Sequence, residues 1–208
     1  QHEAAAMAAV NSSDFETAEK EFAIAISAKP SYDAAYLGSG DLKTKTGHPT
    51  EASLDYVRAA ELYRVAGDLG NALKAYNGAV KTDKSSPAAL QGRANLYLAR
   101  GDQIAAIADF EQLITIDRHN QQAYYGLGLA RFSQGNPKLA IKHFKDARSV
   151  DPQNPDIHEY LMLCYFATDN FKDAKKSYED FIEVANDAEV KDLKKNPKFG
   201  AVLRVVQE

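Results

Sequence analysis

The chain has 208 residues, of which 45% are hydrophobic and 26% are charged, and this composition is ordinary for a globular or repeat protein. Acidic and basic residues are interleaved and the formal net charge is -4, which gives no electrostatic reason to expect nucleic-acid binding. The single cysteine, Cys164, excludes an intramolecular disulfide framework and a cysteine-built metal site. No segment reaches the roughly 18 apolar residues that a membrane span needs.

The chain begins with Gln1 instead of methionine, which indicates a processed or trimmed product. No secretory signal sequence is recognised. The compartment therefore stays open between a soluble cytoplasmic protein and a mature exported or periplasmic form that has lost its signal peptide.

Small and aromatic residues recur along the chain with a period of 34 residues. Four alanines each precede an aromatic residue by four positions, in the pairs Ala72–Tyr76, Ala106–Phe110, Ala140–Phe144 and Ala174–Tyr178. An earlier helix shows the same small and aromatic positions at Ala18, Phe22 and Ala25. Self-similarity at a fixed period is the signature of a repeat array, and such arrays present extended faces instead of one deep pocket.

The repeat phase changes between residues 50 and 65. Ala52 and Tyr56 lie 34 residues after Ala18 and Phe22, yet the step from Ala52 to Ala72 is only 20 residues, so about one helix is missing. One interpretation is that the segment from about Thr50 to Val65 is the second helix of one hairpin and the first helix of the next, with a bend or break there. The alternative is a degenerate second repeat.

Each later unit contains two helical blocks separated by a turn. In one unit the first block holds Leu127 and Gly128, Gly135 marks the turn, and Ala140 and Phe144 lie in the second block. The dipeptides Ser86–Pro87, Asn136–Pro137 and Asn154–Pro155 each combine a preferred capping residue with proline at the first helical position. Each unit is therefore predicted to be a helical hairpin.

This pattern resembles the tetratricopeptide repeat, a 34-residue helix–turn–helix in which small residues lie where the paired helices cross. The resemblance covers nearly the whole chain and implies an all-α, right-handed superhelical solenoid. We expect N-terminal hairpins in residues 1–49, a main array of four repeats in residues 50–186 and a C-terminal capping helix in residues 187–208. In the last repeat Met162 replaces the small residue at the crossing and Asp169 replaces the turn glycine.

The final predicted helix starts at Asn196–Pro197 and carries one apolar stripe. The stripe consists of Phe199, Val202, Leu203 and Val206, spaced i, i+3, i+4 and i+7. Terminal repeats need a cover for their exposed face, so the first interpretation is a cap. The alternative is that this helix lies in the protein's own groove and competes with a partner.

The sequence offers no reaction centre. Its five histidines are scattered, without the clustered ligands of a metal site or the nucleophile and acid–base pair of a catalytic site. We therefore expect no enzyme activity, no cofactor and no metal.

The resemblance implies that the first helix of each hairpin lines the concave face. Its exposed positions in three successive units are Gln91, Asn95 and Leu98, then Tyr125, Leu129 and Phe132, then Glu159, Leu163 and Phe166, with Gln122 and Tyr160 beside them. Aromatic and leucine side chains on a face that should meet water usually mark a partner site, although they could also pack against a neighbouring helix or under the cap.

The function predicted from these features is a non-catalytic protein-interaction module, an adaptor or assembly scaffold. It would bind a protein or peptide partner with apolar anchors in the concave groove, and would bind neither nucleic acid nor, lacking the basic clamp residues of some relatives, acidic chaperone tails. A more polar first-helix face near the N-terminus, with Asp41, Lys45, Glu61 and Arg64, suits a second contact or self-association. The alternatives are a self-assembling structural scaffold and a pilotin-like bacterial envelope lipoprotein.

Overall fold

The computed structural model describes residues 1–207, in which every regular element is a helix. The all-α prediction is therefore confirmed. The chain divides into two compact units, residues 1–100 (unit 1) and residues 101–208 (unit 2). The helices of unit 1 are α1 (His2–Asn11), α2 (Phe15–Ala28), α3 (Asp33–Lys45), α4 (Pro49–Val65), α5 (Leu69–Thr82) and α6 (Pro87–Ala99). Those of unit 2 are α7 (Gln103–Ile116), α8 (Gln121–Ser133), α9 (Pro137–Val150), α10 (Pro155–Phe166), α11 (Phe171–Val184), α12 (Asp187–Lys195), the 3-10 turn η1 (Pro197–Phe199) and α13 (Gly200–Val206).

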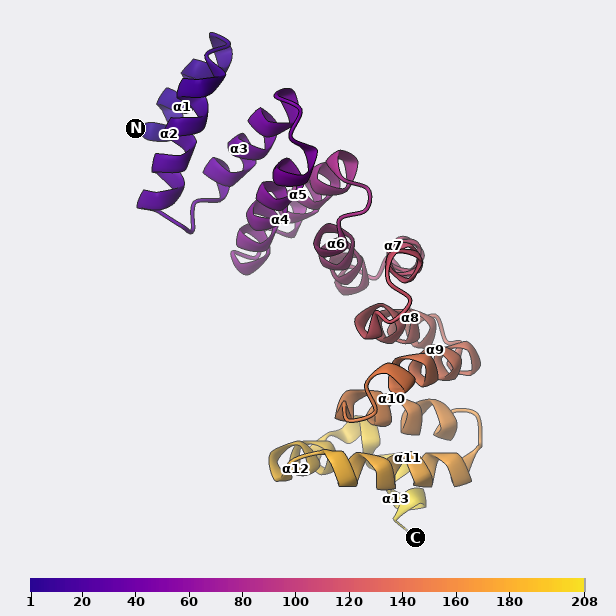
Figure 1. The fold of residues 1–208 in the computed structure, drawn as a ribbon. Coiled ribbons are helices and arrows are strands. Elements are labelled where there is room, and N and C mark those ends of the chain that lie inside the picture. Colours follow the sequence, from indigo (N-terminus) through magenta and orange to yellow (C-terminus); the bar gives the residue numbers. More distant parts are fainter. Residues whose placement is uncertain (208) are drawn as a thin grey trace. The chain divides into compact units, whose positions relative to one another are not determined.

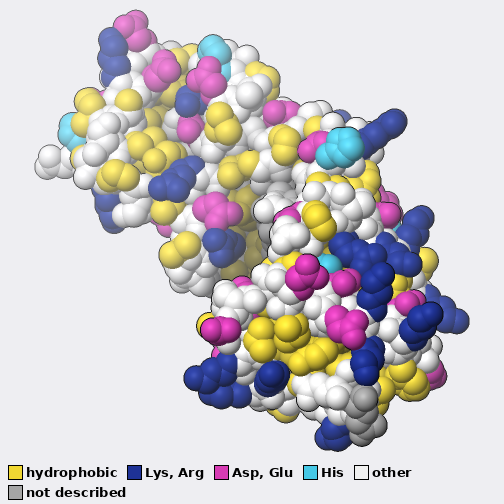
Figure 2. All heavy atoms as spheres, turned by 60° about the horizontal axis from the view of Figure 1, so that its bottom comes forward, with side chains coloured by type: hydrophobic (Ala, Val, Ile, Leu, Met, Phe, Trp, Pro, Cys, Tyr) yellow, Lys and Arg dark blue, Asp and Glu magenta, His cyan; other side chains and the backbone are white. Residues whose placement is uncertain are grey.

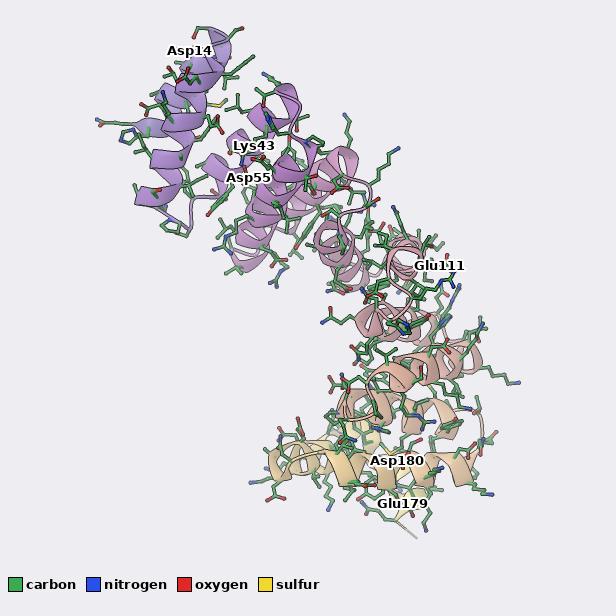
Figure 3. The ribbon with its side chains drawn as sticks, in the orientation of Figure 1. Asp14, Lys43, Asp55, Glu111, Glu179 and Asp180 are labelled. Atoms are coloured by element: carbon green, nitrogen blue, oxygen red, sulfur yellow. The ribbon has the colours of Figure 1, made fainter. Side chains whose placement is uncertain are left out.

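In unit 1, helix α4 packs along both α3 and α5 (Figure 1). It is therefore the second helix of one hairpin and the first helix of the next, as the first interpretation of the phase change proposed for this segment. The bend or break expected there stays a prediction, and the boundary between the two compact units lies after residue 100. A polar network ties α4 to α3: Asp55 accepts hydrogen bonds from Lys43 Nζ at 2.8 Å and from Ser39 Oγ at 2.6 Å. Figure 3 labels Lys43 and Asp55 at this contact between the two helices.

The predicted helix starts are confirmed by their hydrogen bonds. The side chains of Ser86, Asn136 and Asn154 accept from backbone N–H groups in the first turns of α6, α9 and α10, each of which has proline at the start. The turn before α9 places Gly135 at φ 73°, a conformation that glycine adopts without steric cost. Asp169 holds the equivalent position one repeat later at φ 57°, which aspartate tolerates better than most residues.

The aromatic residues at the 34-residue period fill the gaps between successive hairpins. Tyr76 in unit 1 and Phe110 in unit 2 are fully buried, and each ring lies against a glycine of the following helix. A Cβ built on Gly92 would lie 2.3 Å from the Tyr76 ring, and one on Gly126 would lie 2.2 Å from the Phe110 ring. Glycine is therefore required at both positions because the ring occupies the space of a side chain.

The C-terminal segment Pro197–Val206 covers the last hairpin, as Figure 1 shows for α13 beside α11. Phe199, Val202 and Val206 are each exposed by 2% or less within the core of unit 2. Beyond the helix, the Gln207 amide donates a hydrogen bond of 3.0 Å to the Tyr178 hydroxyl on α11. The predicted cap is therefore present.

Candidate partner-binding surface

Four rings of unit 2 form one cluster, which we call the aromatic cluster: Tyr125 and Phe132 of α8, Phe144 of α9 and Tyr160 of α10. Phe144 and Tyr160 are stacked, with centroids 5.4 Å apart and planes 20° from parallel. Tyr160 also meets Tyr125 and Phe132 edge-on, at 5.9 and 5.8 Å. These tilted and edge-to-face arrangements are the favoured geometries of aromatic pairs, so the cluster is a packed unit and not a set of loose surface rings.

The cluster exists because Tyr160 takes the place of a glycine. Position 160 follows Gly92 and Gly126 at the 34-residue period, and both of those glycines receive the ring of the preceding helix. At the α9–α10 contact the incoming Phe144 ring therefore stacks on another ring instead of on bare backbone. The sequence carries this signal, but a single departure from a repeat pattern does not tell which way the larger side chain turns.

Within unit 2, the residues predicted to line the groove differ in how far their side chains are exposed to solvent. Gln122 is exposed, and Tyr125, Leu129, Phe132, Glu159, Tyr160 and Phe166 are partly buried. Leu163 is only 8% exposed and belongs to the core. The ring contacts bring Tyr125 and Phe132 of α8 together with Tyr160 of α10, and Phe144 packs against Tyr125 and Tyr160. Phe166 contacts Phe171 of α11 instead.

The predicted residues on α6 belong to unit 1. Gln91 donates a hydrogen bond of 3.1 Å to Asn95, and Leu98 is partly buried. Asn95 lines a cavity of about 480 Å³ together with Glu61, Arg64 and Tyr76. The apolar residues Leu69, Leu96 and Ala99 line the same cavity, so this part of the predicted site mixes polar and apolar groups. The participation of Gln91, Asn95 and Leu98 in one binding groove stays a prediction.

Lys198 of η1 lies over the aromatic cluster and is not among the residues predicted for this surface. Its ammonium nitrogen is 4.4 Å from the Tyr160 centroid and 5.9 Å from that of Phe132, within the distance at which a cation is attracted by a ring face. The only sequence signal is that Lys198 directly precedes Phe199 of the apolar stripe. Because Lys198 and Phe199 are far from α8 in sequence, the contact between Lys198 and Phe132 of α8 depends on how the C-terminal segment folds back.

The electrostatics of this surface are set by burial and by acidic groups. Burial raises the pKa of the Glu159 carboxyl, the positive charge of Lys198 opposes that rise, and the negative charge of Asp156 adds to it. Burial likewise raises the pKa of the Tyr125 hydroxyl, with Asp156 contributing in the same direction. Tyr125 therefore stays neutral at physiological pH and presents an apolar ring.

The described part of the chain shows no arrangement for metal chemistry. Residues 1–207 contain no group of three or more His, Cys, Asp and Glu side chains that could hold a metal ion. Cys164 is fully buried on α10, and burial raises the pKa of its thiol to about 12, so the reactive thiolate is scarce. Among the same residues, no helix is both long and apolar enough to cross a bilayer.

Three family models match the sequence. Models described as tetratricopeptide repeat match residues 3–66 and 131–196, and one described as TPR repeat matches residues 94–135. No curated protein sequence matches the chain.

Several solved structures share the fold. A crystal structure of the MamA protein is 18% identical over 94% of this chain and 93% of that chain, with a TM-score of 0.55. A tetratricopeptide repeat protein from Parabacteroides merdae is 18% identical over 99% and 96%, with a TM-score of 0.56. The first TPR of Spaghetti (RPAP3), bound to the HSP90 peptide SRMEEVD, is 21% identical over 57% and 97%, with a TM-score of 0.54. At these identities the likeness concerns the fold alone.

Proposed function

Because the chain belongs to the tetratricopeptide-repeat family, whose fold supports protein–protein interaction, we propose that it is a non-catalytic adaptor or assembly factor. Its partner-binding surface is the side of unit 2 formed by α8 and α10. The observation that carries this proposal is the aromatic cluster. At the equivalent contact one repeat earlier, the single ring of Phe110 on Gly126 is enough to pack the hairpins, so the additional rings of the cluster are not needed for packing alone. A ring cluster that stays partly exposed on a repeat protein suits a partner with apolar anchors.

The chemistry of the surface supports a polypeptide partner. Tyrosine and phenylalanine supply large contact area at low conformational cost, and they dominate the binding energy of protein interfaces. Gln122 of α8 is exposed and Glu159 of α10 is partly buried, and their polar groups would orient the backbone of a bound segment. On the face that Figure 2 turns toward the reader, hydrophobic side chains form a patch among charged ones, so apolar surface is not confined to the interior.

The proposal is tested by affinity capture with the full chain and with F132A. Phe132 is preferred to Tyr125 because Tyr125 contacts the fully buried Phe144 at 5.7 Å, so that its loss would also disturb the core. We expect F132A to lose the proteins that the unmodified chain retains, while its circular dichroism spectrum stays the same.

The matched control is F15A, which removes an exposed phenylalanine of α2 in unit 1 and should capture the same proteins as the unmodified chain. Equal capture by F132A and the unmodified chain would show that the cluster is not the partner site. Light scattering over a range of concentrations separates the adaptor from a self-assembling scaffold, since the adaptor stays monomeric.

A further inference from the structure

The ammonium group of Lys198 lies among three rings. Its nitrogen is 4.4 Å from the centroid of Tyr160, 5.4 Å from that of Phe199 and 5.9 Å from that of Phe132. Elsewhere in residues 1–207, the cation–ring contacts of Lys29, Arg58 and Lys145 involve one ring each. The arrangement at Lys198 therefore has the form of an aromatic cage, which is a common way for proteins to bind a cation.

Acidic groups line a cavity that borders Phe199, one of the three rings. A cavity of about 170 Å³ lies beside Phe199 and is lined by the carboxylate residues Asp156, Glu159, Glu189 and Asp192, together with uncharged residues. None of its lining residues is basic. Of these carboxylates, Glu159 neighbours Tyr160 in sequence and interacts electrostatically with Lys198. Because opposite charges attract more strongly where water is partly excluded, the Glu159 carboxylate favours a positive charge over the rings.

Lys198 is held loosely compared with the segment that carries it. Within residues 1–207 its ammonium group has neither a hydrogen bond nor an ion pair, and its side chain is exposed. The anchoring of the C-terminal segment comes instead from the buried side chains of Phe199, Val202 and Val206. The lysine side chain can therefore leave the rings while the cap stays in place.

We propose that Phe132, Tyr160 and Glu159 form a binding site for a lysine or arginine side chain of a partner polypeptide, and that Lys198 fills this site in the free protein. This proposal rests on the proposed function, because it names the chemistry of the partner at the same surface. The partner segment carries its cation next to an apolar residue, as Lys198 stands next to Phe199. It differs from the acidic peptide in the Spaghetti structure, whose carboxylates would meet those of this surface.

The cation site is tested with tetramethylammonium chloride, which is small enough to enter the cage without removing the cap. The probe is titrated into the full-length chain and into K198A while the ring signals of Phe132 and Tyr160 are followed by NMR. K198A should reach half-saturation at a concentration about fivefold lower than the unmodified chain, because no internal cation competes. K191A, which removes an exposed lysine of α12, should behave as the unmodified chain.

Two further titrations make the test specific for charge. Tert-butanol, a neutral molecule of similar size, should shift the ring signals of neither protein at the same concentrations. The double variant K198A/E159Q should lose most of the gain seen in K198A. Equal affinities of K198A and the unmodified chain for tetramethylammonium, or equal shifts with tert-butanol, would overturn the proposal.

The polypeptide part is tested with two fluorescein-labelled peptides, Gly-Ser-Lys-Phe-Ser-Gly and its counterpart with methionine in place of lysine. Fluorescence anisotropy should show that K198A binds the lysine peptide about fivefold more tightly than the unmodified chain does, with no gain for the methionine peptide. Equal binding of the two peptides would contradict the proposal. Dimers that the unmodified chain forms and K198A does not would also contradict it, because the site would then take Lys198 of a second copy instead of a partner's side chain.

The two proposals fail in different ways. If capture does not depend on Phe132 but K198A binds tetramethylammonium as expected, the cation site stands and the partner surface lies elsewhere. If capture depends on Phe132 but the cation titrations show no difference, the partner surface stands and its ligand is not cationic.

Discussion

Units 1 and 2 stack their hairpins through aromatic residues, but they treat the rings differently. In unit 1 the ring carries a hydroxyl that reaches a carboxylate: Tyr76 donates to Glu61, and Tyr56 donates to Asp41 at 2.5 Å. In unit 2 the fully buried rings at the same repeat position are Phe110 and Phe144, which, like Phe22 of unit 1, have no hydroxyl, whereas Tyr178 of the last repeat accepts a hydrogen bond from Gln207. The same ring packing therefore lies beside carboxylates on α3 and α4 in unit 1 and beside further rings on α8 and α10 in unit 2.

A second difference lies within unit 2. The Phe110 ring lies on Gly126, whereas the Phe144 ring stacks on Tyr160. The first contact is closed to ligands because backbone and ring already touch. The second contact adds a ring at the edge of the surface, and Lys198 lies over it. A single change from glycine to tyrosine in the repeat pattern thus separates a purely structural contact from a candidate binding surface.

The largest expected effect concerns the thiol of Cys164, which reports on unit 2 alone. Burial raises its pKa from 9.0 to about 12, so alkylation by iodoacetamide at pH 8 should be about 10³-fold slower than in the urea-unfolded chain. The raised folded-state pKa also means that the neutral thiol stabilises unit 2 fully below pH 9, and that this stabilisation is lost as the pH rises toward 12. Native alkylation as fast as in the unfolded chain would show that unit 2 opens readily.

The next effect is the loss of a stacking ring. F144A removes a fully buried side chain, and we expect a decrease of about 3–5 kcal/mol in the free energy of unfolding. Hydrogen exchange should locate the loss in α8 to α10. Y178A removes the partly buried aromatic of the last repeat and should lower the free energy of unfolding by less. A larger decrease from Y178A than from F144A would show that the ring of the last repeat contributes more to stability than Phe144 does.

Filling the glycine contact should have an intermediate effect. G126A places a Cβ 2.2 Å from the Phe110 ring, and such overpacking typically costs about 1–3 kcal/mol, which exceeds the gain in helix propensity of about 1 kcal/mol. The control is G70A in α5, where the nearest atom is 3.5 Å away, and it should leave stability unchanged or raise it. Thermal unfolding of both variants provides the measurement.

The smallest effect tests the polar chemistry of unit 1. Y76F removes the hydroxyl that donates to Glu61 and should cost about 1 kcal/mol, because Glu61 is partly exposed and keeps its bonds from Arg64. Y125F removes a hydroxyl with no hydrogen-bond partner in residues 1–207 and should change stability little. Equal decreases in the free energy of unfolding of Y76F and Y125F, measured in urea, would show that the Tyr76–Glu61 hydrogen bond does not set unit 1 apart from unit 2.

Much of the fold could be predicted because its determinants are local and repeated. The spacing of alanine and aromatic residues, the capping of α9 by Asn136 and the turn at Gly135 all act within one hairpin or between neighbouring hairpins. The 20-residue step between Ala52 and Ala72 indicated a shared helix as one of two interpretations, and the packing of α4 against both α3 and α5 selected it. Such contacts follow from helical geometry and need no knowledge of distant parts of the chain.

The candidate surface was only partly predictable. The pattern placed Tyr125, Phe132 and Glu159 on one face, but it also placed Leu163 there, and the structure buries Leu163 in the core. An exposed stripe drawn on one helix ignores what the next hairpin and the cap cover. Lys198 lies outside the repeats and could not be assigned by their period.

By itself, the sequence determined that this protein is a stack of helical hairpins, because small residues and rings at a fixed period allow few other ways to bury apolar surface. Only the tertiary structure decided that the Tyr160 ring lies over Phe144 and that the cation of Lys198 lies over both Tyr160 and Phe132. The physical reason is that the rotamer of a substituted side chain, and the path of a segment beyond the last repeat, are set by the space that all neighbouring helices leave.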